Sequence, residues 1–237
     1  MQAYLLDSYA KQLRTSVAAV IDANHVVLTD TVFYPSGGGQ PTDTGALVRE
    51  SDGKEFAVTL VKKENGQMVH EVDQGGLAVG DEVLCSIDWE RRYKLMRMHT
   101  AAHILCAIIN KHTGALITGN QLDVERSRID FNLDQFDKAA IERYVAEANA
   151  SIAKGAPVTI SSMKREAAMA VPHLVKLAGA LPPSIAELRI VKIGDIDEQA
   201  DGGTHVKDAN EIGTIKVISL ENKGKNNRRM YFSLEHQ

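Results

Sequence analysis

Cysteine is nearly absent from this chain of 237 residues, which has only Cys85 and Cys106. Two isolated cysteines cannot build a disulfide framework, so the composition favours a reducing, cytoplasmic setting. Long hydrophobic runs are missing too, because no apolar stretch approaches the roughly 18–20 residues that span a bilayer. The first residues show no basic segment followed by an apolar one, so we expect no signal peptide. We therefore predict a cytoplasmic protein that does not bind membranes.

An excess of positive charge is also lacking, since the formal net charge is −4. This balance argues against non-specific binding of polyanions over the whole surface. With 44% hydrophobic and 24% charged residues, the composition is that of a globular protein. Basic residues nevertheless gather locally, which is compatible with a confined phosphate contact. The groups are Arg91, Arg92, Lys94 and Arg97; Lys164 and Arg165; and Lys223, Lys225, Arg228 and Arg229.

Internal repeats and low-complexity segments are absent, and the chain changes character near residue 87. Before that point, short alternating or β-branched runs are separated by Gly, Asn and Asp, which predicts a small β-barrel or sandwich. Examples of the expected strands are residues 17–21, 25–28, 55–61 and 82–87.

After that point the pattern is mixed. Asp88 can cap a helix over residues 89–113 that Gly114 ends. A second helix is expected over 134–154, and 164–178 is helical but interrupted by Pro172. Strands are expected at 121–124, 127–131, 158–161, 187–193, 212–220 and 230–234. We predict an α+β fold, with an N-terminal β-barrel-like domain at 1–87 and an α+β domain with a mainly antiparallel sheet at 88–237.

Two histidines, His99 and His103, stand four residues apart inside the first predicted helix. Residues at this spacing lie on one helical face, so both imidazoles can point at one metal ion. Taken alone, the pair is explained equally well by two histidines packed near a core. The zinc-protease variant is excluded, because Thr100 stands where that motif has its glutamate base.

The segment 199–205 reads Gln-Ala-Asp-Gly-Gly-Thr-His and ends at His205. Its glycine pair permits a tight turn or a close approach to a ligand. Taken alone, the segment is explained equally simply as a surface turn whose histidine has no functional role. Beside the helical pair, it supplies a third imidazole, and a catalytic zinc has three protein ligands and an open position.

A glycine-rich segment, residues 33–45, reads Phe-Tyr-Pro-Ser-Gly-Gly-Gly-Gln-Pro-Thr-Asp-Thr-Gly. A phosphate-binding loop is disfavoured, because no Lys-Ser/Thr follows and no helix begins there. A plain hairpin turn is the simpler alternative. We favour a loop that wraps around a ligand or another loop.

In this order, these segments resemble the alanyl-tRNA editing family, whose freestanding members are called AlaX and whose relatives are editing domains of alanyl-tRNA synthetases. The resemblance covers nearly the whole chain, and the chain looks similar to the medium-length freestanding form of the family. The segments that carry it are residues 37–41, 99–103, 128–131, 202–205 and 223–229.

The resemblance implies a hydrolase that removes a wrongly attached amino acid, usually serine and sometimes glycine, from alanine tRNA. Such a second site is needed because a synthetase pocket rejects these amino acids weakly by size. The resemblance also implies one Zn²⁺ per chain, held at the catalytic centre by His99, His103 and His205. Whether that ion activates water or polarises and positions the ester stays open.

One position departs from the family pattern, because Asp201 stands where the family usually has the cysteine of Cys-Gly-Gly-Thr-His. Asp201 can be a fourth metal ligand, or it can orient a ligating histidine from outside. Alternatively, Gln199 or water takes that place. We favour Asp201 as a ligand, and we expect Cys106 to be buried rather than to bind the ion.

The resemblance further suggests which residues contact the substrate. Hydroxyl or amide groups before residue 128 can hydrogen-bond the serine hydroxyl, although ordinary polar turn groups are an even alternative. The substrate-binding candidates are Gly38, Gly39, Gln40 and Thr44 in the glycine-rich segment, and Thr118, Asn120, Gln121 and Arg128. The candidates for tRNA phosphates are Lys223, Lys225, Arg228 and Arg229, followed by Arg91, Arg92 and Arg97.

The expected partner is mischarged alanine tRNA, bound by a monomer or weak homodimer; no protein partner is inferred. Three other readings stay open. The chain can be a non-catalytic tRNA- or RNA-binding module with a structural zinc, which requires a closed four-ligand site. It can be a metal-dependent hydrolase of a small ester or amide, or a family member that has lost activity through the change at Asp201.

Overall fold

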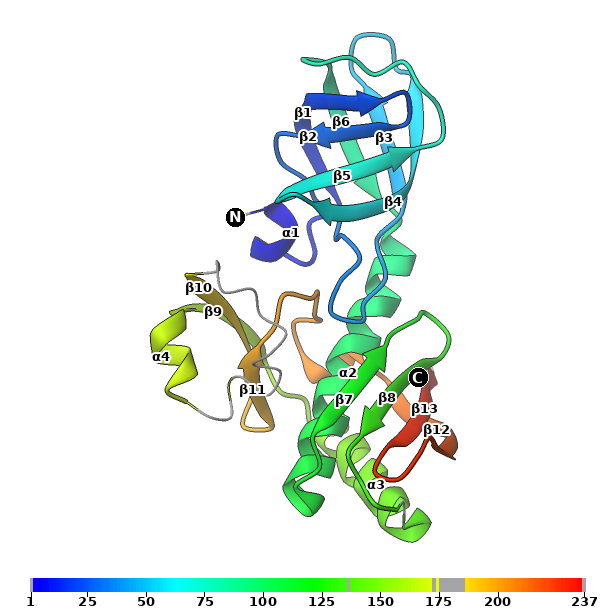
Figure 1. Cartoon of the computed structure of the whole chain (residues 1–237), viewed down its shortest axis with the longest axis vertical. Coiled ribbons are helices and arrows are strands. Elements are labelled where there is room, and N and C mark those ends of the chain that lie inside the picture. The colour runs from blue at the N-terminus through cyan, green and yellow to red at the C-terminus, as the bar shows by residue number, and fades with distance from the viewer. Residues whose placement is uncertain (1, 136, 172–173, 175–185, 236–237) are drawn as a thin grey trace. The chain divides into compact units, whose positions relative to one another are not determined.

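The computed structural model describes residues 2–135, 137–171, 174 and 186–235 (Figure 1). The chain forms two compact units, Met1–Met96 and Arg97–Gln237, and the division falls inside helix α2 (Trp89–Thr113). A barrel in the first unit, and helices with antiparallel sheets in the second, confirm the predicted α+β class. The domain division at residue 87 stays a prediction.

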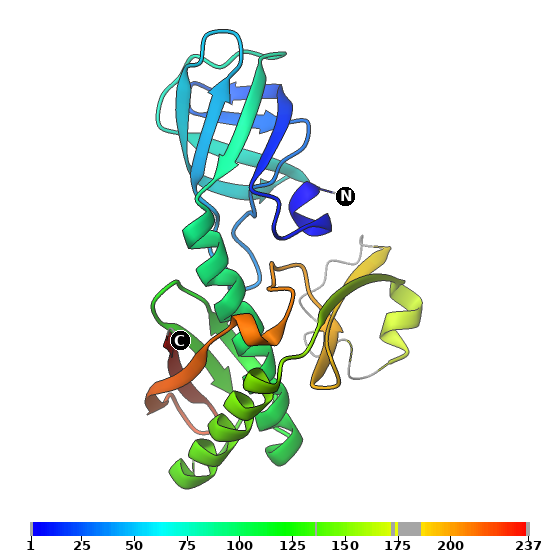
Figure 2. The same ribbon diagram turned by 180° about the vertical axis from the view of Figure 1, so that it is seen from behind.

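The first unit is a closed barrel of antiparallel strands in the order β1-β2-β5-β4-β3-β6 (Figures 1 and 2). Its interior is filled by side chains such as Leu47, Phe56 and Val83, which have no exposed surface. Closure of the barrel removes the unpaired strand edges. The elements are α1 (Ala3–Leu6), β1 (Gln12–Asp22), β2 (His25–Leu28), β3 (Gly45–Arg49), β4 (Glu55–Glu64), β5 (Gln67–Val72) and β6 (Glu82–Ile87).

A buried ion pair ties the beginning of α2 to the barrel unit. The Arg92 guanidinium donates to Asp43 through Nε, 3.0 Å from Oδ1, and through Nη2. The same guanidinium donates to the carbonyl oxygens of Ser8, at 2.9 Å, and Val32, at 2.7 Å. Both charged side chains are fully buried, so Arg92 has no surface to offer to a phosphate. Its position indicates a structural role, because removal of one partner from such a pair costs about 3–5 kcal/mol.

His70 is a buried histidine of the barrel, with Nε2 2.9 Å from the Thr31 hydroxyl oxygen. Burial lowers the pKa of His70 from 6.5 to about 4. Between these two pH values, His70 binds a proton in the unfolded chain but not in the folded chain. The folded state therefore has its full stability with respect to this group above pH 6.5, and its free energy of unfolding decreases as the pH falls towards 4. We expect this group to remove about 3 kcal/mol from the free energy of unfolding between pH 7 and a pH below 4. Urea denaturation at several pH values measures it. The free energy of unfolding of His70→Gln should depend less steeply on pH than that of the parent protein. Parallel curves for the two proteins would contradict the prediction.

The second unit contains the rest of α2, a four-stranded and a three-stranded antiparallel sheet, and a long helix α3. Figures 1 and 2 show the two sheets on opposite sides of α2. No helix among the described residues is both long and apolar enough to cross a membrane. The four-stranded sheet has the order β12 (Thr214–Asn222), β13 (Arg228–Glu235), β8 (Ser127–Phe131) and β7 (Ile117–Gln121). The three-stranded sheet has the order β11 (Asp197–Ala200), β10 (Glu187–Ile193) and β9 (Val158–Lys164). The helices of this unit, besides α2, are α3 (Lys138–Lys154), α4 (Arg165–Met169) and the 3₁₀ turn η2 (Ala209–Glu211).

Most predicted elements are confirmed; the errors lie at segment ends and in the strands β3, β5 and β11, which were not predicted. The bounds of α2, β8 and β10 agree with the prediction. Helix α3 begins later than residue 134, because the Asp137 side chain caps it by accepting from the Ala140 amide. The strand expected at 121–124 is wrong: β7 ends at Gln121, and the Asp123 carboxylate accepts from the next amide at 2.6 Å, as in a turn. Of the expected helix 164–178, the structure shows α4; Pro172 lies outside the described residues.

Candidate metal centre

Helix α2 presents His99 and His103 on one face, one turn apart. Their ring centroids are 5.0 Å apart, and the two residues are only 4% and 6% exposed. Neighbouring positions of the helix, including Met98 and Ile104, are buried as well, so this part of α2 lies in the interior of the protein. Burial restricts access of water and strengthens electrostatic interactions inside the site.

The turn after β11 brings Asp201 and His205 to the same place. Arg189 on β10 holds this turn, because its Nη1 donates to the carbonyl oxygens of Asp201, at 3.0 Å, and Gly203, at 2.9 Å. The Asp201 amide in return donates to the Arg189 carbonyl oxygen at 3.0 Å. The His205 ring stacks on His99 with centroids 4.4 Å apart. The turn is therefore bonded to β10 and contacts α2 through the His205 ring.

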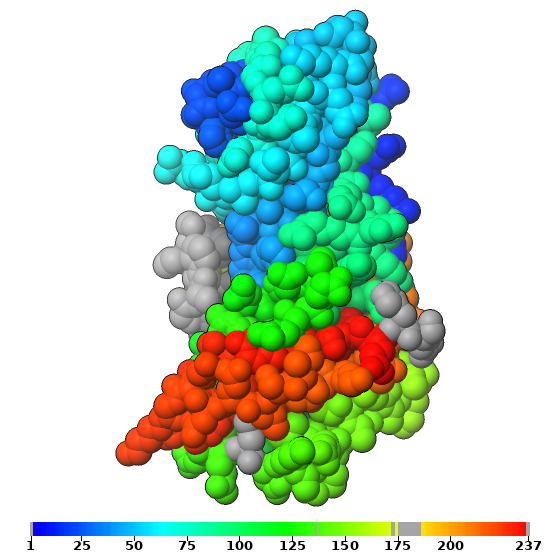
Figure 3. Space-filling model, turned by 90° about the vertical axis from the view of Figure 1, so that its right-hand side faces the viewer, coloured from blue at the N-terminus to red at the C-terminus, as the bar shows by residue number. Residues whose placement is uncertain are grey.

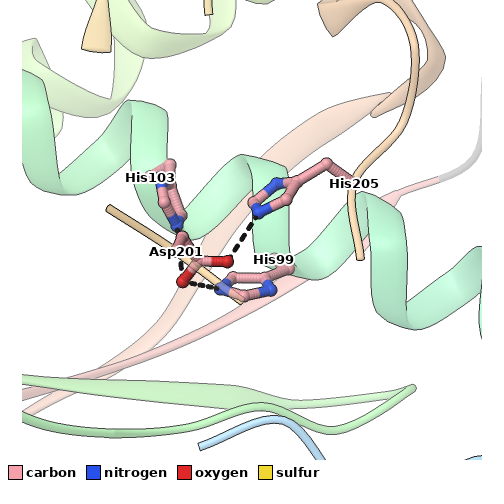
Figure 4. Close-up of side chains that lie close together, drawn as sticks. All are labelled: His99, His103, Asp201 and His205. Carbon is pink, nitrogen blue, oxygen red and sulfur yellow. Dashed lines mark hydrogen bonds and ion pairs between the residues drawn. The ribbon is translucent and has the colours of Figure 1, made fainter. Parts of the chain in front are cut away.

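Figure 4 shows the Asp201 carboxylate between the three imidazoles. Its Oδ1 lies 3.1 Å from His205 Nε2, and its Oδ2 lies 3.6 Å from His99 Nε2 and 3.8 Å from His103 Nε2. One ligand atom from each residue lies within 4.8 Å of all the others. A tetrahedral zinc with bonds of about 2.0–2.1 Å separates its ligand atoms by roughly 3.4 Å. This set of three nitrogens and one oxygen therefore fits a zinc ion.

Burial and mutual charge set the protonation of these four groups. Burial lowers the pKa of His99 well below its ordinary value and that of His205 to about 4. Burial also acts to lower the pKa of His103, but its hydrogen bonds with Asp197 and Asp201 outweigh burial and raise it to about 9. Burial would raise the pKa of Asp201, yet the adjacent imidazoles, His99 first, hold it well below its ordinary range. A cation bound here would replace the Nε2 proton of His103.

The His99 ring leaves no room for a side chain at position 203. A Cβ at position 203 would lie 2.1 Å from His99 Cε1 and 2.3 Å from His99 Nδ1, far inside contact distance. A Cβ at Gly202 would meet nothing within 4 Å. The two glycines of the Gly-Gly pair therefore differ: Gly203 is required by the close approach of the turn to the imidazole.

Three residues around the cluster escaped the sequence analysis: Asp197, Thr100 and Arg189. The Asp197 Oδ2 lies 3.0 Å from His103 Nδ1, and the Thr100 hydroxyl oxygen lies 3.1 Å from His205 Nδ1. Thr100 offered a signal, because it stands next to His99 in the helix. Asp197 and Arg189 offered none, since they belong to strands whose position relative to α2 no local pattern reveals.

Gln199 and Cys106 were weighed as alternative ligands. The Gln199 amide nitrogen donates to Asp197 at 2.8 Å and lies 2.7 Å from His103 Nδ1, on the side of that ring away from the Asp201 carboxylate. The buried Cys106 is not a member of the cluster found among the described residues. Asp201 is thus the group that meets the three Nε2 atoms.

The predicted amino-acid pocket residues lie on β7 and β8. Thr118 and Gln121 are exposed, and Asn120 is half-buried. Arg128 donates through Nε to the Gln121 amide oxygen at 3.2 Å and through Nη1 to the Asp130 carboxylate at 2.9 Å. Their contribution to substrate binding stays a prediction.

The glycine-rich segment belongs to the first unit. It contains a tight turn in which the Gly37 and Gln40 amides donate to each other's carbonyl oxygens at 3.1 and 2.9 Å. Gly38 and Gly39 adopt φ values of +58° and +87°, which side chains other than glycine rarely allow. Gln40 is buried, and Thr44 is half-buried. The segment is a shaped turn, and its role in binding stays a prediction.

The predicted tRNA-binding residues lie at the β12–β13 hairpin, whose orange-red tip projects from the second unit in Figure 3. Arg229 makes two bonds to Asp130, at 2.7 and 2.9 Å, and Lys223 pairs with Glu221 at 2.7 Å. Arg228 is buried and donates to carbonyl oxygens of the hairpin turn, including Gly224 at 2.7 Å. Lys225 is exposed. The same hairpin therefore holds exposed and internally bonded cations.

Family models match both units. The model of class II (A) tRNA synthetases matches residues 2–91. The model described as the threonyl and alanyl tRNA synthetase second additional domain matches residues 188–231, a stretch that contains β10 from Leu188 onward, the Asp201 turn and His205.

Relatives match along nearly the whole chain. The alanyl-tRNA editing protein AlaX-M of Methanosarcina barkeri is 50% identical over 236 residues, which are 98% of this chain and 97% of that protein. AlaX-M of Saccharolobus solfataricus is 46% identical and covered to 98% on both sides. The alanine–tRNA ligase of Pyrobaculum neutrophilum is 38% identical over 91% of this chain but 25% of its own length. The chain therefore belongs to the AlaX family of alanyl-tRNA editing proteins.

Proposed function

We propose that this protein hydrolyses the ester bond of mischarged alanine tRNA, releasing serine, and in some cases glycine, from the terminal ribose. The observation that carries the proposal is the convergence of three imidazole Nε2 atoms on one carboxylate in a buried site. This donor set suits a single Zn²⁺ per chain. The names of the full-length relatives supply the tRNA class.

We propose that His99, His103, His205 and Asp201 hold the ion. Bound there, zinc supplies a Lewis acid that activates a water molecule or polarises the ester carbonyl. The chain's own part is to enclose the ion with the buried helix face and to hold the carboxylate in place. The Gly203 amide donates to Asp201 Oδ1 at 2.6 Å, which fixes that oxygen against the loop.

Selection of serine over alanine requires a polar group that recognises the hydroxyl. We assign this role to the pocket candidates on β7, of which Thr118 offers an exposed hydroxyl. Arg128 then helps to hold Gln121. Gly38, Gly39, Gln40 and Thr44 of the first unit stay candidates for contact with the substrate. Phosphates of the acceptor stem are contacted by Lys223, Lys225 and Arg229, with Arg228 shaping the hairpin turn. The protein acts as a monomer or weak homodimer in the cytoplasm.

A deacylation assay tests the proposal. We expect purified protein to release serine from Ser-tRNA(Ala) while leaving Ala-tRNA(Ala) largely intact, and a chelator to reduce the rate by at least about 100-fold. Readdition of Zn²⁺ should restore the rate. Gly-tRNA(Ala), assayed in parallel, decides the second substrate. Full activity in protein shown by elemental analysis to contain no metal would exclude a metal-dependent reaction.

A second function has one observation in its favour. Four donors, including Asp201, surround the centre, and a closed set of four protein ligands is typical of structural zinc. Under this alternative the protein binds tRNA without hydrolysing it. The two are separated by the same assay, because a structural zinc predicts tRNA binding with no release of serine from any aminoacyl-tRNA.

A further inference from the structure

The three imidazoles point Nε2 towards the Asp201 carboxylate, so their Nδ1 atoms face outward. A neutral imidazole that offers Nε2 to a cation must carry its proton on Nδ1. An outward Nδ1–H needs an acceptor, because a buried donor without a partner costs about 1–3 kcal/mol. The groups that meet these Nδ1 atoms therefore decide how well each ring is prepared for a cation.

His103 meets a carboxylate on its outward side. Asp197 Oδ2 lies 3.0 Å from Nδ1, and both side chains are almost completely buried. An ionised carboxylate only accepts, so Asp197 favours the tautomer with the proton on Nδ1. The Gln199 amide nitrogen lies 2.7 Å from the same Nδ1 and favours the opposite tautomer, so the two neighbours compete for this atom. The Gln199 amide donates to the same Oδ2 at 2.8 Å and holds the carboxylate in place. Both Asp197 and Gln199 belong to β11, the strand that leads into the Asp201 turn.

His205 meets a hydroxyl on its outward side. The Thr100 oxygen lies 3.1 Å from Nδ1 and also accepts from the Val206 amide at 3.3 Å. Thr100 has no exposed surface. It stands on α2 between the two histidines of the helix, so the His-Thr-Ala-Ala-His segment contains two proposed ligands and a contact to the third.

We propose that Asp197 and Thr100 are positioning residues, which hold His103 and His205 with Nδ1–H turned outward and Nε2 turned towards the proposed metal. The proposal rests on the proposed metal site and adds to it the groups that set tautomer and orientation. A carboxylate partner also makes an imidazole a better electron donor, and loss of such a partner typically costs 10–100-fold in metal affinity. Neither residue touches the substrate in this scheme.

The Thr100 pair of variants gives the cleaner test. Thr100→Val keeps the shape of the side chain and removes the hydroxyl, whereas Thr100→Ser keeps the hydroxyl. We expect Thr100→Val to lose about 10–100-fold in Zn²⁺ affinity, measured by chelator competition, and Thr100→Ser to stay within about threefold of the parent protein. Equal affinities of the two variants at equal thermal stability would overturn the role of Thr100.

Asp197 is tested by a graded series. Asp197→Ala removes the acceptor and should lose about 10–100-fold in Zn²⁺ affinity, while Asp197→Asn, whose amide oxygen can still accept, should fall between it and the parent. Glu198→Gln is the matched control, because Glu198 is the next residue and pairs with Lys192 at 3.6 Å on the surface. It should leave the affinity unchanged.

Nitrogen-15 NMR of the histidine rings in zinc-loaded protein separates positioning from mere loss of stability. In the parent protein, His103 and His205 should show protonated Nδ1 and metal-bound Nε2. In Thr100→Val the His205 pattern alone should change, and in Asp197→Ala that of His103 alone. Unchanged patterns in both would overturn the inference. If the parent binds zinc but releases no serine, the proposed function fails while these affinities and spectra still decide the inference.

Discussion

Replacement of His205 with alanine is expected to abolish Zn²⁺ retention and to lower kcat/KM for Ser-tRNA(Ala) by at least about 10³-fold, or about 4 kcal/mol. The reason is geometric, since His205 is the imidazole that comes from outside α2 in the cluster of described residues, and its Nε2 lies 3.1 Å from Asp201. Without it, two histidines on one helix face and a carboxylate remain, a set that leaves the ion more exposed. Elemental analysis and a deacylation assay on the same sample measure both effects.

His112→Ala is the matched histidine control for this experiment. His112 also lies on α2, but its Nε2 bonds Glu147 at 2.6 Å and its ring stacks on Tyr144, away from the cluster. The control should retain one Zn²⁺ per chain and the parent rate. A His205→Ala protein that keeps both zinc and full activity would contradict the proposed site.

Substitution of Gly203 with alanine is expected to lower Zn²⁺ affinity and the deacylation rate by about 100-fold or more. The added methyl group would overlap the His99 ring, at 2.1 Å from Cε1, and would lie 3.0 Å from Asp201 Oδ1. The buried ring has little room to yield, so it moves or the turn moves, and a displacement of about 1 Å at a reactive site costs roughly 10²-fold.

Gly202→Ala is the matched control, because it adds the same methyl group at the adjacent position. The methyl group added there meets nothing within 4 Å, and Gly202 is not among the glycines with positive φ. We expect zinc affinity and rate within about twofold of the parent. If the two alanine variants behave alike, the close approach of Gly203 to His99 does not control the site.

The local residue pattern was sufficient to predict an element where all of the residues that mark its bounds lie in or beside that element. The helix 89–113 was correctly bounded, because its capping Asp88 and terminal Gly114 flank an uninterrupted helical sequence. Strands β3 and β5 were not predicted. Gly45 opens β3, and His70 and Glu71 break the apolar alternation of β5. Their strand state comes from pairing within the closed barrel, a tertiary effect.

The candidate ligands were also predictable, because chemistry at fixed spacing marks them. His99 and His103 share a helix face by geometry alone, and the Gly-Gly-Thr-His segment offers His205 as a third imidazole. The family resemblance added that these segments belong together and that Asp201 stands at the position of the family's cysteine. The structure brings all four together. The resemblance strengthened the link between the two segments, because no local rule connects a turn to a helix about 100 residues away.

The chain's residue pattern thus settles the α+β class, the long helix and the identity of the metal-binding candidates, since each depends on short-range periodicity or on residue chemistry. The surroundings of those candidates depend on the folded chain. Asp197 meets His103 and Thr100 meets His205 across separations of 94 and 105 residues. Such contacts exist only after β11 and its turn pack against α2, because burial and direction, rather than sequence neighbours, choose the hydrogen-bond partner of a buried ring.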